Sequence, residues 1–231
     1  MKTIGIVGGI GPESTIEYYR LIIAAYREQK QDGSYPQVLI NSINLKTMLD
    51  FISADQLLEV TEFLLNEIKK LAQGGADVGL LAANTPHIVF DDLQRQSPIP
   101  LVSIVEATCE AVRALGLKKV GLFGTRFTMQ GGFYPEVFSR QGIALSVPDP
   151  DDQAYIHDTY MSDLVNGVAL PETRRQFLMI AKRLQEQNGI QGLILGGTEL
   201  SLIFRDATYG GIPFLDTTKI HAKKIVAQIL S

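Results

Sequence analysis

Short apolar runs alternate along the whole chain with longer segments of helical periodicity. The runs occupy residues 4–7, 38–40, 78–81, 101–102, 120–123, 193–195 and 213–215. They lack the period-two alternation of a half-exposed strand, which is typical of strands covered by helices on both faces of a parallel sheet. The pattern therefore predicts an α/β fold in which helices flank parallel sheets.

Helix signals lie between these runs. Pro12 suits a first helical turn, and its helix is expected to bury the face formed by Ile16, Tyr19, Ile23 and Tyr26. Ser53 is expected to cap a second helix that ends at Gly74. The apolar stripe of that second helix is expected to consist of Leu57, Thr61, Leu64, Ile68 and Leu71.

Two segments of the chain occur twice at nearly the same spacing. Residues 2–8 resemble residues 118–124, and residues 77–85 resemble residues 191–199. We therefore expect two pseudosymmetric half-domains, 1–98 plus 216–231 and 99–215. If the halves face each other, their strand ends meet across a cleft that would form the active site.

Composition and charge exclude several classes of protein. The only cysteine, Cys109, allows neither an intramolecular disulfide nor a thiolate zinc cage. A net charge of −4 offers no bulk attraction to nucleic acid or to an anionic membrane, and no apolar run is long enough to span a bilayer. No His or carboxylate spacing is typical of a metal site. We expect a cytoplasmic protein that binds a small molecule.

A glycine-rich turn follows the first strand at residues 8–15. Free backbone N–H groups and the helix dipole at such a turn favour a carboxylate or phosphate ligand. A dinucleotide is disfavoured because Ser14 replaces the third glycine of that fingerprint and Pro12 removes an N–H donor. The alternative is a tight strand-to-helix turn with no ligand.

Other polar residues follow later strands, at the edge where open α/β sheets usually bind ligands. The strand at 78–81 leads into Asn84, Thr85 and His87, and the strand at 193–195 leads into Thr198 and Glu199. Thr125 and Thr128 follow the strand at 120–123 and can donate hydroxyl hydrogen bonds to a carboxylate. Together with Gly9, these residues predict a pocket for a small zwitterion.

The chain resembles the aspartate/glutamate racemase superfamily over essentially its whole length. The resemblance rests on the glycine turn at 8–15, the Asn-Thr-x-His segment at 84–87, residues 124–129, the Gly-x-Thr-Glu segment at 196–199, and Asp216-Thr217 followed by His221-Ala222. It implies an isomerase without cofactor or metal, a homodimer, and racemisation by two cysteines that face each other across the substrate α-carbon.

The sequence departs from that pattern at both cysteine positions. Ala83 and Gly197 stand there, and neither side chain can transfer a proton. Cys109 lies in a helical stretch and is expected to be buried in the core, so His87 and Glu199 are the candidate substitutes. The double substitution Ala83→Cys with Gly197→Cys is predicted to create racemase activity if the pocket geometry survives.

These observations favour a cofactor-independent amino-acid racemase-like protein that binds a small amino or dicarboxylic acid between its halves. Its substrate contacts are expected from Gly9, Asn84, Thr85, Thr125, Thr128, Thr198 and Glu199. The alternative is a catalytically silent small-acid binding protein, a pseudoenzyme, which directly explains the missing thiols. A decarboxylase or cis-trans isomerase of the same superfamily is less favoured, since such relatives generally keep one cysteine.

Overall fold

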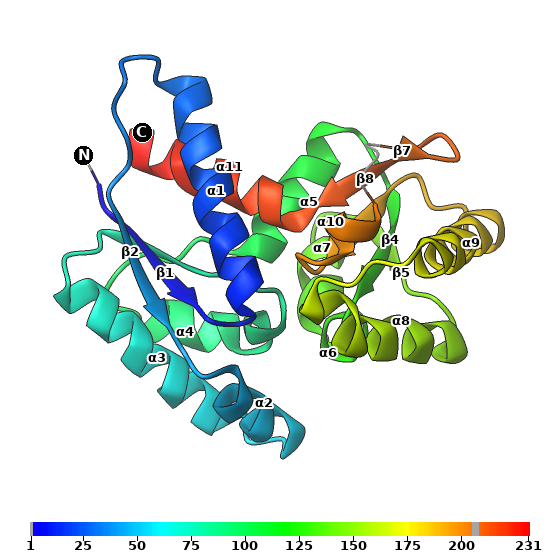
Figure 1. Cartoon of the computed structure of the whole chain (residues 1–231), viewed down its shortest axis with the longest axis horizontal. Helices are drawn as coiled ribbons and strands as arrows, with labels where there is room; N and C mark the ends of the chain where they lie inside the picture. The colour runs from blue at the N-terminus through cyan, green and yellow to red at the C-terminus, as the bar shows by residue number, and fades with distance from the viewer. Residues whose placement is uncertain (1, 205–207) are drawn as a thin grey trace. The chain divides into compact units, whose positions relative to one another are not determined.

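The computed structural model describes residues 2–204 and 208–231, which divide into two compact units. Unit 1 comprises Met1–Ile104 and Thr218–Ser231, and unit 2 comprises Val105–Thr217. In each unit helices flank a parallel sheet, as the ribbon in Figure 1 shows. The predicted α/β class with two parallel sheets is therefore confirmed.

Unit 1 holds a three-stranded sheet in the order β2-β1-β3. Its strands are β1 (Ile4–Gly8), β2 (Val38–Ser42) and β3 (Val78–Leu81), all parallel. A parallel bridge between Gly79 and Leu101 extends the pairing beyond β3. Its helices are α1 (Pro12–Gln29), α2 (Leu45–Ser53), α3 (Leu57–Gln73), the 3-10 helix η1 (Thr85–Val89), α4 (Phe90–Gln96) and, from its second residue onward, α11 (Thr217–Leu230).

Unit 2 holds a five-stranded sheet in the order β5-β4-β6-β8-β7. Its strands are β4 (Lys119–Gly124), β5 (Ala144–Ser146), β6 (Leu193–Gly196), β7 (Thr208–Tyr209) and β8 (Ile212–Asp216), and only β7 pairs antiparallel. Its helices are, from its second residue onward, α5 (Ile104–Ala114), then α6 (Arg126–Gln130), α7 (Phe133–Ser139), α8 (Pro150–Ser162), the 3-10 helix η2 (Leu164–Asn166), α9 (Pro171–Asn188) and α10 (Leu200–Ile203).

The two sheets share one strand order. In each sheet the first strand of the unit lies in the middle, between the second and the third strand of that unit. The order β2-β1-β3 therefore matches the order β5-β4-β6. The bridge at Leu101 takes the place beside β3 that β8 takes beside β6. The duplicated segments of the sequence thus form equivalent strands, which confirms the predicted pseudosymmetry of the two sheets.

The core of unit 1 depends on the C-terminal helix. Ile4 and Ile6 of β1 share a buried cluster with Tyr18 and Ile22 of α1 and with Ile225 of α11. On the opposite face, Gly5 lets α3 approach closely, because a Cβ there would lie 3.3 Å from the Cβ of Leu71. Helix α11, from the end of the chain, therefore packs with α1 against the sheet that the first hundred residues form.

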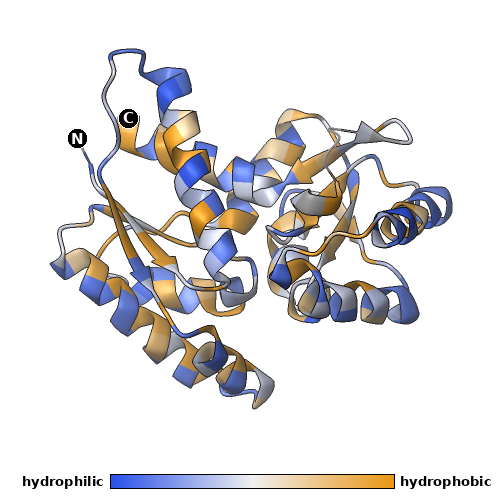
Figure 2. Ribbon diagram, viewed as in Figure 1, coloured by the Kyte–Doolittle hydropathy of each residue, from blue (hydrophilic) through white to orange (hydrophobic). Residues whose placement is uncertain are grey.

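The core of unit 2 packs α8 and α9 against β4 and β6. Phe123, Tyr160, Phe177 and Leu195 belong to one buried cluster. In Figure 2 the outer turns of α9 are coloured hydrophilic, whereas strand β1 of unit 1 is coloured hydrophobic. Helix α9 thus has a polar outer side and a core-facing side that includes Phe177, Ile180 and Leu184.

Two local predictions are wrong. Helix α1 buries Tyr18 and Ile22, while Ile16 and Tyr19 are exposed, so the first turns bury a face offset by one position from the predicted one. Tyr26, at the end of the predicted face, is buried as expected. Ser53 ends α2 and does not cap α3, because Asp55 adopts a φ of 57° and redirects the chain between the two helices.

Among the residues that the structure describes, no helix is long and apolar enough to cross a membrane.

Candidate functional site

The glycine turn of unit 1 is closed by hydroxyl groups of its own helix. Gly9 adopts a φ of 77°, a conformation that favours glycine, and its N–H donates to Thr15 Oγ1 at 2.8 Å. Thr15 Oγ1 in turn donates to the carbonyl of Gly11 at 3.2 Å. Ser14 Oγ donates to the carbonyl of Ala82 at 2.8 Å and ties the turn to the end of β3. A ligand anion would have to displace Thr15 to receive the Gly9 N–H.

Asn84 and Thr85 lie directly beyond β3, as predicted. Both side chains are buried, and Asn84 occupies the cap position of η1. Ala83, the first of the two family cysteine positions, is partly exposed. Since β1 and β3 are paired side by side, these residues and Gly9 lie at the same edge of the unit 1 sheet.

His87 is buried and has a backbone partner at each ring nitrogen. Nδ1 donates to the Ala83 carbonyl at 3.0 Å, and Nε2 accepts the Ile104 N–H at 3.1 Å. Burial, with a smaller contribution from His221, lowers the pKa of His87 from 6.5 to about 3. The ring is therefore neutral, and the hydrogen bond from Ile104 occupies the one lone pair that a base would use.

His221 forms a second buried histidine site in unit 1. Its Nε2 donates to the Val102 carbonyl at 2.8 Å, so Nδ1 accepts the Tyr18 hydroxyl, also at 2.8 Å. Burial lowers the pKa of His221 to about 4. The ring centroids of His87 and His221 lie 6.2 Å apart. The pair links η1, α1 and α11 through neutral hydrogen bonds.

Thr125 and Thr128 lie at the corresponding edge of unit 2. Thr125 follows β4 and caps α6, since its Oγ1 accepts the Thr128 N–H. Thr128 is fully buried against the ends of β4 and β6. A Cβ added to Gly124 would lie 2.9 Å from the Cβ of Thr128. Gly124 pairs with Gly196, so both threonines lie close to the segment that follows β6.

Gly197, the second family cysteine position, is buried against an aromatic ring. A Cβ placed on Gly197 would lie 2.6 Å from both Cε2 and Oη of Tyr160, a residue of α8. Such a separation is shorter than real Cβ contacts allow. The phenol of Tyr160 therefore fills the space into which a side chain at residue 197 would project.

Glu199 is buried, and its carboxylate accepts a short hydrogen bond from the Tyr160 hydroxyl. Burial and the adjacent carboxylate raise the pKa of Tyr160 well above its usual value of 10, so the phenol keeps its proton. Thr198, between Gly197 and Glu199, is partly exposed, and its carbonyl accepts the Ser201 hydroxyl at 2.8 Å.

Tyr160 was not found by sequence reasoning. It lies on α8, far along the chain from β6, and no motif marks it. The one available signal was the glycine at residue 197, because a buried position without a side chain must be filled by a neighbour. The partners of His87 were missed for the same reason, since Ile104 is distant in sequence.

Cys109 is buried in α5 and lines a surface pocket of about 300 Å³ in unit 2. Burial raises the pKa of its thiol, which keeps the group protonated and unreactive. Its position on α5 is apart from the strand ends that carry the threonines and Glu199.

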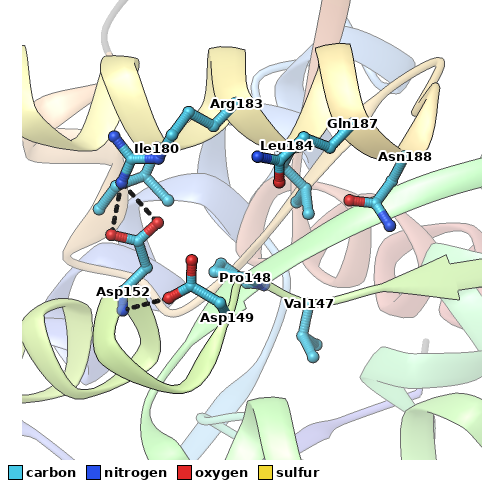
Figure 3. A pocket seen from close by; sticks show the side chains of 9 residues that line it. All are labelled: Val147, Pro148, Asp149, Asp152, Ile180, Arg183, Leu184, Gln187 and Asn188. Atoms are coloured by element: carbon cyan, nitrogen blue, oxygen red, sulfur yellow. Dashed lines mark hydrogen bonds and ion pairs between the residues drawn. The ribbon is translucent and has the colours of Figure 1, made fainter.

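A second cavity of unit 2, of about 230 Å³, lies between the start of α8 and the last turns of α9 (Figure 3). Arg183 reaches across it to Asp152 at 2.5 Å, and Asp149 caps α8 by accepting the Asp152 N–H. None of the predicted site residues lines this cavity. Within residues 2–204 and 208–231, no group of three or more His, Cys, Asp or Glu side chains could hold a metal ion.

The fold and the polar residues at the carboxyl ends of its strands together define a class of protein. Each unit is a parallel α/β sheet whose polar residues gather beyond the carboxyl ends of two paired strands, the usual place for small ligands in such sheets. The chemistry offered there consists of hydroxyls, an amide and one carboxylate.

Comparison with known proteins makes this class more specific. RacX, a broad specificity amino-acid racemase of Bacillus subtilis (strain 168), is 25% identical over 99% of this chain and 98% of its own length. The solved structure of PH1733, an aspartate racemase homologue from Pyrococcus horikoshii OT3, is 34% identical with a TM-score of 0.85, covering 100% of both chains. The Picrophilus torridus aspartate racemase shares the fold, with a TM-score of 0.76 and 21% identity over 99% of this chain and 94% of its own.

The chain belongs to the Asp/Glu/hydantoin racemase family, whose model matches residues 7–225. This membership confirms the resemblance predicted from the motifs and supports an isomerase of the racemase type.

Proposed function

We propose that this protein binds a small amino or dicarboxylic acid at the carboxyl ends of its strands and acts on it as an amino-acid racemase-like isomerase. The observation that supports the proposal most is the edge formed by β4 and β6. There, Thr125, Thr128 and Thr198 lie at the same edge of the sheet as the buried Glu199, in a chain of the Asp/Glu/hydantoin racemase family.

The proposed contacts divide by charge. Threonine hydroxyls and the side-chain amide of Asn84 suit the substrate carboxylate, and Glu199 suits the ammonium group. The Gly9 N–H would join them only after Thr15 releases it. Thr85 would contribute a further hydroxyl from unit 1. His87, whose ring nitrogens hold Ala83 and Ile104, is proposed as a positioning residue for the segment beyond β3.

The test is α-hydrogen exchange with each enantiomer of a panel of amino acids in deuterated water, followed by mass spectrometry and chiral chromatography. Deuterium incorporation supports an enzyme. A thermal shift with the same panel measures binding separately, because a ligand that prefers the folded state raises the melting temperature.

The second candidate function is a catalytically silent binder of the same acids. It is favoured by Ala83 and Gly197, which leave both family positions without a titratable group. Thermal stabilisation by an amino acid without any exchange would select this candidate. Absence of both stabilisation and exchange across the panel would contradict the proposed ligand class. The homodimer implied by the resemblance stays a proposal, to be measured by sedimentation.

A further inference from the structure

We propose that the Tyr160–Glu199 pair carries the proton of unit 2, in the place of the cysteine that the family has at residue 197. The proposal rests on the proposed function, because it needs an amino acid bound beside the ends of β4 and β6. It concerns one face of the ligand and assigns Tyr160 a role that no motif of the chain indicates.

Placement is the first step. A side chain at residue 197 would project along the Cα–Cβ direction of Gly197, and the Tyr160 hydroxyl lies 2.6 Å from that Cβ position. The phenol oxygen therefore stands beside the point from which a thiol would reach the substrate. Tyr160 comes from α8 and Gly197 follows β6, so packing of that helix on the sheet, and no local sequence, brings the hydroxyl there.

Orientation is the second step. The hydroxyl donates to Glu199 Oε2, and both side chains are buried, with exposed fractions of 6% and 8%. Burial removes competing water and holds the phenol in one rotamer, which is the preorganisation that a proton carrier needs. The Glu199 carboxylate accepts the hydrogen bond of the phenol, so it can take the phenol's proton when the phenol oxygen receives another.

The chemistry balances when the two groups act together. The α-C–H bond of the bound amino acid breaks, its proton bonds to Tyr160 Oη, and the proton of the phenol moves to Glu199 Oε2. The electron pair stays on the α-carbon and delocalises into the substrate carboxylate. While Tyr160 Oη and Glu199 Oε2 hold these protons, water exchanges them through the 6% and 8% of the two residues that stay exposed. The reverse transfers then return a solvent-derived proton to the same face and restore the ionised Glu199.

We call this coupled proton transfer, from the α-carbon to Tyr160 and from Tyr160 to Glu199, the relay. The relay avoids an unfavourable intermediate. A phenolate next to an ionised carboxylate would place two negative charges in a buried site, and the raised pKa of Tyr160 expresses that cost. In the relay the phenol is neutral before and after the transfer, and the negative charge passes between Glu199 and the substrate. The pair therefore has the basicity of a carboxylate at the position of the hydroxyl.

A carrier on one face predicts a characteristic outcome. In unit 1, Ala83 has no titratable group, and both ring nitrogens of His87 have backbone partners. A proton removed and returned by Tyr160 alone would exchange the α-hydrogen of one enantiomer with solvent while its configuration is retained. This stereoselective exchange is an activity distinct from racemisation.

The experiment compares full-length wild type with Tyr160→Phe and Glu199→Gln in deuterated water. Wild type is expected to label one enantiomer with retention. Tyr160→Phe keeps the ring against Gly197 and is expected to lower the labelling rate at least about 100-fold, the lower range for a general acid–base group, while the thermal shift by the same amino acid persists. Glu199→Gln keeps a hydrogen-bond acceptor but cannot take the proton, so labelling is expected to fall equally.

Tyr155→Phe is the matched control, because it removes a hydroxyl from the same helix at a partly exposed position. It should label at the wild-type rate. Labelling by Tyr160→Phe at the wild-type rate would overturn the relay, as would an amino acid that stabilises the wild type without any labelling. The latter result leaves the binding function standing. No stabilisation by any amino acid would overturn the proposed function and the relay with it.

Discussion

The equivalent strand ends of the two units are built from the same duplicated segment, yet they offer different chemistry. Ala83, Asn84 and Thr85 beyond β3 correspond to Gly197, Thr198 and Glu199 beyond β6. In unit 1 the nearby titratable group is His87, which is bound at both nitrogens to the backbone. In unit 2 it is Glu199, which is bound to a phenol and able to exchange a proton with it.

The difference shows how one duplicated edge can serve structure in one copy and chemistry in the other. A neutral, doubly bonded histidine fixes two backbone segments and has no proton to give without breaking them. A carboxylate that accepts a hydrogen bond from a hydroxyl can take a proton through that partner. The asymmetry predicts that the two units respond differently to acid, to new side chains and to loss of a hydroxyl.

Acid should affect unit 1 most strongly. His87 and His221 have pKa values of about 3 and 4 in the folded unit, whereas an unfolded histidine titrates near 6.5. Below pH 6.5 the unfolded chain therefore binds more protons, and the free energy of unfolding falls by about 1.4 kcal/mol per histidine per pH unit until the folded pKa is reached. Above pH 6.5 the two histidines add no pH dependence.

Pulse proteolysis in urea at pH 7.5, 5.5 and 4.5, with peptides assigned to each unit by mass, measures this directly. Unit 1 should lose stability several-fold more steeply than unit 2. His157→Gln is the control, since His157 is a partly exposed histidine of unit 2 that accepts the Arg126 N–H. Burial lowers the pKa of His157 as well, so this variant removes the contribution of that histidine to the acid sensitivity of unit 2. Parallel loss of stability in both units would show that the buried histidines are not the cause.

New side chains at the two family cysteine positions should also have unequal effects. Gly197→Cys forces a Cβ against Tyr160 and is expected to destabilise unit 2 by roughly 1–3 kcal/mol, the usual cost of overpacking. Ala83→Cys adds one atom at a partly exposed position and should cost about 0.5 kcal/mol or less. Urea unfolding of the single variants measures both values.

A double-mutant cycle with Tyr160→Ala isolates the contact. Removing the ring should relieve the cysteine, giving a favourable coupling of about 1–3 kcal/mol between residues 160 and 197. In the double substitution Ala83→Cys with Gly197→Cys, the thiol at residue 197 therefore needs a smaller residue at position 160 before it can face a ligand. Additive effects of the two changes would mean that Tyr160 does not occupy that space in solution.

Sequence patterns predicted the sheets well and the site only in part. Apolar runs located β1, β3, β4 and β6, because buried parallel strands are continuous in hydrophobicity. They also located β2 and β8, which are only partly buried. β5 was missed since it has only three residues, one exposed and two partly buried, which carry no such signal. The inner face of α1 was misplaced because Tyr18 is buried through a hydrogen bond to His221, a partner that only the folded chain supplies.

The site shows the same limit. Motifs correctly placed Asn84, Thr85, Thr125 and Glu199 beyond strand ends, since sequence order and parallel pairing fix which residues follow a strand. They could not show that a ring from α8 covers Gly197, nor that the Ile104 N–H occupies the lone pair of His87. Both facts depend on packing between segments distant in the chain.

The smallest expected effect concerns the hydroxyls that close the two edges. Thr15 closes the glycine turn of unit 1 from within its helix, whereas Thr125 closes the turn of unit 2 from the cap position. Thr125→Ala removes that cap and should destabilise unit 2 by about 1 kcal/mol, whereas Thr125→Ser keeps the oxygen and should cost only a few tenths. Because the same hydroxyl is a proposed carboxylate donor, the alanine variant should also lose part of the thermal shift given by amino acids, and the serine variant should keep it. A stability loss without any change in that shift would assign Thr125 to the helix alone and leave Thr128 and Thr198 as the hydroxyl donors of unit 2.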